Sequence, residues 1–225
     1  MAIERQASAT PTTIARPGRL LGGGTTGNER LTSTTGAVLI VLLAVLGLTI
    51  IGIGQLLWVH LFVGMLLIGP LVLKLASTGY RFVRYYAHDE RYVRKGPPPT
   101  ALRLLAPLVV LTTLIVFASG VALLFAGPSS RDTLFPIHKL SFFAWLVFMA
   151  IHVLAHLPEV VRSLRADYGG ARHSREATPW RSADDLNGRA GRTLSLAGAL
   201  TSGLVLAIVL IPQFGPWISA NNLHH

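Results

Sequence analysis

A nearly unbroken apolar run from Gly36 to Ser77 constrains this chain more than any other feature. Its only strongly polar residues are Gln55, His60 and Lys74. One helix needs about 20 apolar residues to cross a hydrocarbon layer of about 30 Å, so the run is long enough for two. The sequence therefore predicts two membrane-spanning helices, at about 36–53 and about 56–79, with a tight turn between them.

Three later apolar segments predict three more spans, at about 102–125, 135–157 and 194–211. The whole chain of 225 residues is 51% hydrophobic and only 13% charged, whereas charged residues make up about a quarter of a typical soluble domain. A soluble fold of this length could not bury so much apolar surface. The predicted fold class is all-α: an integral membrane helical bundle with five transmembrane helices and the lipid bilayer as its surroundings.

The basic residues lie in blocks between the apolar runs. Of the 20 Lys and Arg residues, 17 fall in the N-terminal tail and in the segments 81–103 and 159–192. The positive-inside rule places these segments in the cytoplasm. We expect a multi-pass protein of the plasma membrane with a cytoplasmic N-terminus and an extracytoplasmic C-terminus. The net charge of +10 does not indicate nucleic-acid binding, because no compact basic domain carries it.

Composition divides the chain into four parts. We expect a disordered cytoplasmic tail at 1–34, a four-helix transmembrane bundle at 35–158, a polar cytoplasmic loop at 159–192, and a fifth transmembrane helix with a short extracytoplasmic tail at 193–225. The hydroxyl residues from Thr32 to Thr35 are placed to cap the first span. The chain has no cysteine, which excludes disulfides, thiolate-held iron–sulfur clusters and covalently attached c-type haem.

Four histidines fall inside the predicted spans: His60, His138, His152 and His156. An imidazole in hydrocarbon is costly unless it is paired or bound. His60 and His138 each lie about one turn into a span, and these two spans run in the same direction. The two rings are therefore expected at one depth near the outer surface, as ligation of one haem iron by two histidines requires.

A second level is expected nearer the cytoplasm. His152 follows His138 by 14 residues, about 21 Å along a helix and within about 40° of the same face, and His156 lies one turn further. Lys74 follows His60 by the same interval. Three roles stay open for Lys74: its ammonium extends to the interface, it contacts a haem propionate or a quinone oxygen, or it ligates iron as a neutral amine.

Several alternatives stay open. The histidines could instead form hydrogen bonds between helices. Gly64, one turn after His60, would let a porphyrin approach the backbone, or would serve close helix packing alone. One b-type haem is the prediction that His60 and His138 carry, and a second haem at His152 stays possible. The rival functions are a cofactor-free membrane anchor or assembly protein and a small transporter with a histidine proton relay.

Three short motifs carry a family resemblance. They are Trp58-Val-His60-Leu-Phe-Val-Gly64, Pro136-Ile-His138-Lys-Leu-Ser-Phe-Phe and Ile151-His152-Val-Leu-Ala-His156. Together they resemble membrane cytochrome b proteins, in particular the haem-binding membrane subunits of hydrogenases, formate dehydrogenases and exported molybdenum oxidoreductases. The segment from Lys74 to Tyr86 is similar to actinobacterial proteins of that kind. The resemblance covers about 36–158.

The resemblance implies a function. The chain would be a non-catalytic electron-transfer subunit that carries electrons between an extracytoplasmic oxidoreductase subunit or electron carrier and the quinone pool. His60 and His138 would be the axial ligands of an outer haem, and His152 a candidate ligand of an inner one. Lys74 departs from a full two-haem pattern, since it stands where an inner ligand on the second span would be expected.

Overall fold

The structure is a computed structural model that describes residues 24–94, 100–168 and 188–222. Within these ranges the regular elements are all helices. Five of them are long and apolar enough to cross a membrane, which confirms the predicted fold class. The helices are α1 (Gly24–Ile51), α2 (Ile53–Tyr86), α3 (Glu90–Val93), α4 (Thr100–Ala126), the 3₁₀ helix η1 (Pro128–Ser130), α5 (Arg131–Tyr168), α7 (Arg189–Val209) and α8 (Ile211–Asn222).

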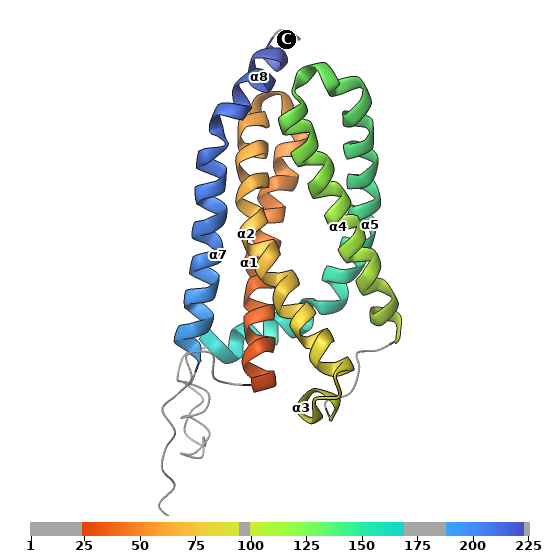
Figure 1. Ribbon diagram of the computed structural model, residues 1–225, viewed down its shortest axis with the longest axis vertical. Coiled ribbons are helices and arrows are strands. Elements are labelled where there is room, and N and C mark those ends of the chain that lie inside the picture. Colours follow the sequence, from red (N-terminus) through yellow and green to blue (C-terminus); the bar gives the residue numbers. More distant parts are fainter. Residues whose placement is uncertain (1–23, 95–99, 169–187, 223–225) are drawn as a thin grey trace, which may run out of the picture.

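Two antiparallel hairpins organise the bundle (Figure 1). α1 turns into α2 at Gly52, whose carbonyl accepts hydrogen bonds from the amides of Gln55 and Leu56. α4 turns into α5 through Gly127 and η1. Gly127 has a φ of 77°, a backbone conformation that glycine adopts more readily than other residues. Both turns lie at one end of the bundle, which we call the hairpin end; the opposite end, near α3, is the α3 end.

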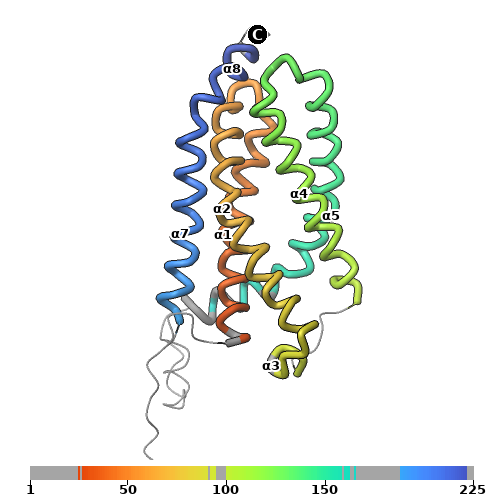
Figure 2. The backbone as a smooth tube through the Cα atoms, viewed as in Figure 1, coloured from red at the N-terminus to blue at the C-terminus, as the bar shows by residue number. Residues whose placement is uncertain are grey.

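The last spanning helix, α7, is the closest neighbour of α2 (Figure 2). A Cβ atom at Gly69 would overlap the Ala199 carbonyl, and one at Gly203 would overlap the Leu66 carbonyl. Pro70 explains part of this contact: it has no N–H, so the Leu66 carbonyl four residues earlier receives no helical hydrogen bond from it. The Cα of Gly203 lies against that carbonyl, and small residues of this kind let membrane helices approach closely.

The helices form two blocks, one of α1, α2 and α7 and one of α4 and α5 (Figures 1 and 2). In the described chain α2 and α5 make no extensive backbone contact. The blocks meet where α5, which contains Pro158, turns across the α3 end and packs on α1 (Figure 1). At the hairpin end α8 contacts α2, α4 and η1, and the Asn221 side chain donates a 2.6 Å hydrogen bond to the Gly54 carbonyl.

Two clusters of buried side chains fill the space between these helices. One contains Met65, Leu124, Ala207 and Phe214 and joins α2, α4, α7 and α8. The other contains Leu39, Val63 and Leu67 and is contacted by Phe117 of α4. Between α4 and α5, the buried indole of Trp145 donates a 3.0 Å hydrogen bond to the hydroxyl of Thr113. Most remaining apolar side chains face outward, as expected in lipid.

The ends of the helices differ from the predicted ones. α1 begins at Gly24, not near residue 36, so residues 24–34 of the expected disordered tail are helical, and 1–23 lie outside the described residues. Thr32 and its neighbours therefore lie inside the helix and do not cap it; the Thr34 and Thr35 hydroxyls bond carbonyls of their own helix. α5 continues to Tyr168, into the expected 159–192 loop, of which 169–187 lies outside the described residues.

Candidate functional site

His60 lies on α2, one to two turns from the hairpin end. Its Nδ1 is 2.8 Å from the hydroxyl of Thr49 on α1. That hydroxyl also donates a 2.6 Å hydrogen bond to the Leu46 carbonyl of its own helix. The imidazole is half-buried and is therefore fixed to a neighbouring helix through the nitrogen nearer its backbone.

His138 occupies the matching place on α5. Its Nδ1 is 2.9 Å from the hydroxyl of Ser119 on α4. Gly120 gives the ring room, since a Cβ there would lie 3.0 Å from the imidazole Cε1. Ser141, one turn along α5, lies 3.3 Å from the Ser119 hydroxyl.

The two imidazoles lie close enough to interact electrostatically. They come from different blocks of the bundle, α2 and α5, between which there is no extensive backbone contact among the described residues. Each ring is tied through Nδ1 to a hydroxyl of its own hairpin partner, which leaves Nε2, the outer nitrogen, for another partner. The structure thus brings His60 and His138 to one region near the hairpin end.

Gly64 lies one turn after His60 on α2. A Cβ atom at this position would meet no atom within 4 Å, although the residue is partly buried. The backbone of α2 is therefore open beside His60. Close helix packing, which explains Gly69, does not explain Gly64.

Lys74 lies nearer the α3 end, where α2 faces α1. Its ammonium donates a 2.8 Å hydrogen bond to the backbone carbonyl of Thr32, and a Cβ at Gly36 would lie 3.1 Å from the Nζ atom. The sequence left three roles open for Lys74. The structure adds a contact that none of them includes, a hydrogen bond to the backbone of the neighbouring helix. Gly36 provides the space for it.

His152 and His156 form a second group on α5. Their ring centroids are 4.7 Å apart at an angle of 52°, and Lys74 lies close enough to His152 to act on it electrostatically. His60 and Lys74 on α2 are separated by fourteen residues, as are His138 and His152 on α5. Lys74 therefore lies near His152, just as His60 lies near His138. The group at the α3 end differs from the pair at the hairpin end because it contains a lysine and because its two histidines come from one helix.

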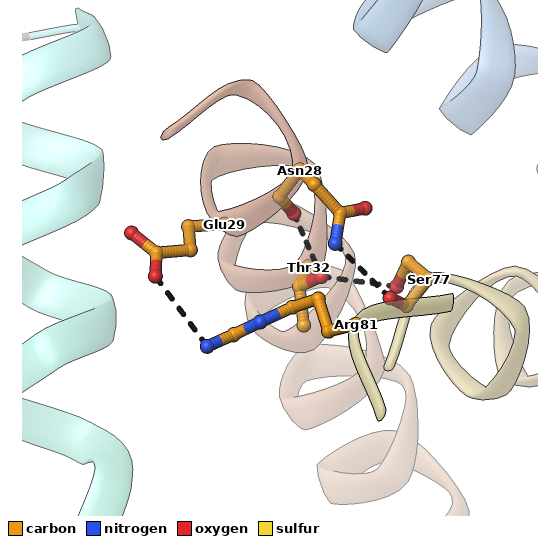
Figure 3. Close-up of polar contacts among 5 residues, drawn as sticks. All are labelled: Asn28, Glu29, Thr32, Ser77 and Arg81. Atoms are coloured by element: carbon orange, nitrogen blue, oxygen red, sulfur yellow. Dashed lines mark hydrogen bonds and ion pairs between the residues drawn. The ribbon is translucent and has the colours of Figure 1, made fainter. Parts of the chain in front are cut away.

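Further polar contacts join α1 to α2 at the α3 end (Figure 3). The Thr32 hydroxyl donates a 3.0 Å hydrogen bond to the Ser77 hydroxyl, and the Asn28 amide donates one of 3.1 Å to the Ser77 carbonyl. Arg81 forms an ion pair of 3.4 Å with Glu29. These contacts hold the α1–α2 hairpin together at the α3 end.

The sequence analysis missed Thr49, Ser119 and Gly120, which position the two outer imidazoles. Their signal in the sequence is faint, because a single hydroxyl or glycine in an apolar span commonly serves its own helix. Thr112 shows this ordinary case: its hydroxyl bonds carbonyls of α4. A hydroxyl level with a histidine on the adjacent antiparallel helix is the feature that would have identified Thr49.

At the hairpin end, His60 and His138 are the two imidazoles that could act as ligands to a metal centre. Among the described residues no group of three or more His, Asp or Glu side chains could hold a metal ion. Haem iron requires only two axial ligands from the protein, since the porphyrin supplies the other nitrogens. Two imidazoles on separate helices, each with Nδ1 engaged, are the ligand set for that arrangement.

Comparison with protein-family models, with curated proteins and with solved structures gave no match to this chain.

Proposed function

We propose that this chain is a b-type cytochrome of the plasma membrane, with one haem held between His60 and His138. The observation that carries the proposal is the nearness of these imidazoles on helices of different blocks, each held through Nδ1 by a neighbouring hydroxyl. A bound haem would supply one-electron redox chemistry. Its two axial positions would both be taken by protein, so the site is suited to electron transfer and not to oxygen chemistry.

Each group of residues would have its own role in holding the haem. His60 and His138 bind iron through Nε2, and the α1 and α4 hydroxyls orient the rings. Gly64 leaves the backbone of α2 open beside His60, so that a flat macrocycle can approach it. The surrounding apolar side chains exclude water, which keeps the site in a low dielectric.

The electron path follows from the proposed orientation. The hairpin end would face outward, so the outer pair would receive electrons from, or deliver them to, an extracytoplasmic oxidoreductase subunit or electron carrier. The quinone pool in the bilayer would be the other partner. The inner group of Lys74, His152 and His156 would contact the second partner or a second haem, with His152 as its candidate ligand.

A visible spectrum of the detergent-purified protein tests this proposal. We expect a Soret band and, after reduction, the sharp α and β bands of low-spin haem. His60→Ala and His138→Ala should abolish these bands, whereas His88→Ala, at the turn after α2, should keep them. Haem stoichiometry in the wild-type protein and in His152→Ala decides between one and two haems.

Full haem content in both ligand variants would overturn the assignment. A wild-type protein without haem, purified from cells supplied with a haem precursor, would instead favour the cofactor-free anchor.

A further inference from the structure

The hydrogen bonds around Thr49 determine where the proton of His60 lies. A threonine hydroxyl has one proton, and a backbone carbonyl can only accept. Since the Thr49 hydroxyl donates to the Leu46 carbonyl at 2.6 Å, its proton is used. With that proton directed at Leu46, the 2.8 Å contact to His60 is a hydrogen bond only if Nδ1 carries a hydrogen and the Thr49 oxygen accepts it, so this arrangement favours a hydrogen on Nδ1.

The same count of hydroxyl protons and acceptors applies to the contacts of His138. The Ser119 hydroxyl donates to the Val116 carbonyl at 3.0 Å, and the Ser141 hydroxyl donates to the His138 carbonyl at 2.9 Å. With the Ser119 proton on the Val116 carbonyl and the Ser141 proton on the His138 carbonyl, the 2.9 Å contact to His138 is a hydrogen bond only if Nδ1 donates to the Ser119 oxygen. A hydrogen on Nε2 instead would force Ser119 to give up its bond to Val116.

Both imidazoles are therefore held as the same neutral tautomer, with the hydrogen on Nδ1 and the lone pair on Nε2. This is the form in which histidine ligates iron, and the partner of the other ring nitrogen selects it. We propose that Thr49 and Ser119 are positioning residues that fix this tautomer and thereby set the haem affinity and the reduction potential of the site. This inference rests on the proposed function.

The direction of the effect follows from the hydrogen bond. A hydroxyl oxygen that accepts from Nδ1–H makes the imidazole a stronger electron donor to iron, which favours the oxidised state. Removal of the acceptor should raise the midpoint potential. Loss of such an outer partner typically lowers metal affinity by about 10–100-fold, and we expect a loss of this size in haem affinity.

The experiment uses the purified haem-loaded protein. Thr49→Val and Ser119→Ala remove the two acceptors with little change in volume. Their matched controls are Thr112→Val and Ser202→Ala, because these hydroxyls bond carbonyls of their own helices. Redox titration gives the midpoint potential, and transfer of haem to an excess of a haem-free acceptor protein gives the rate of loss.

We expect both acceptor variants to show a higher potential and faster haem loss than the controls. Thr49→Ser, which restores a hydroxyl, should return both quantities to the wild-type values even if Thr49→Val binds no haem at all. If Thr49→Val and Ser119→Ala match their controls, or if Thr49→Ser fails like Thr49→Val, the positioning role is wrong while the haem assignment stands. A wild-type protein without haem would overturn the proposed function itself.

Discussion

The crossing of α2 and α7 allows a direct test of the fold through Gly203→Ala. The new methyl group would overlap the carbonyl oxygen of Leu66. That oxygen belongs to the backbone of α2, so it cannot rotate away as a side chain could, and the two helices must separate. Overpacking of this kind typically costs about 1–3 kcal/mol. At 1.4 kcal/mol for each factor of ten, the folding equilibrium constant should fall between about fivefold and about a hundredfold.

The assay is unfolding in bicelles by titration with dodecyl sulfate, followed by tryptophan fluorescence. Gly198→Ala is the matched control, because it lies on the same helix and an added Cβ would meet no atom within 4 Å. Since alanine favours a helix over glycine by up to about 1 kcal/mol, this control should be as stable as the wild type or slightly more so. Equal unfolding midpoints for Gly203→Ala and Gly198→Ala would refute the close crossing.

Three further predictions address other parts of the molecule. Gly120→Ala should push the His138 imidazole from its place, because the new Cβ would lie 3.0 Å from Cε1, and should lower haem content measured per chain. Ser77→Ala should lower the free energy of unfolding by about 0.5–1.5 kcal/mol, since it removes the buried 3.0 Å bond from Thr32. Because the chain has no cysteine, Arg94→Cys should react with a membrane-impermeant maleimide only after cells are opened.

Each of these predictions has its own control. Gly79→Ala adds a methyl group where no atom lies within 4 Å, and its haem content should equal that of the wild type. Ser202→Ala removes an exposed hydroxyl that bonds its own helix and should leave stability unchanged. Ser219→Cys, exposed on α8, should react in intact cells. The reverse labelling pattern of the two cysteines would invert the proposed orientation.

The spans themselves could be read from the sequence because each depends on a long apolar segment, a local property. The ends of α1 and α5 could not. Thr34 and Thr35 read as residues outside a helix, yet their hydroxyls bond carbonyls one turn back in α1. Polar residues after Pro158 read as a loop, yet α5 continues to Tyr168, since apolar length fixes only the part of a helix that lies within the hydrocarbon.

The candidate site shows the same limit. The nearness of His60 and His138 was predictable because helix direction alternates and both residues stand near the start of their spans. The hydroxyls that hold them were not, since Thr49 and Thr112 look alike in the sequence and differ only in what lies opposite. Nor does a glycine such as Gly203 identify its partner, because many pairs of helices could meet through small residues.

The place of α7 has a consequence for biosynthesis. Of the five spans described, α7 is synthesised after the other four, yet it is the closest neighbour of the second one. The Gly69 face of α2 is therefore exposed to lipid while the α4–α5 hairpin inserts. Until α7 arrives, the α1–α2 hairpin lacks its tightest contact, so the crossing of Gly69 and Gly203 can form only after all five spans have been made.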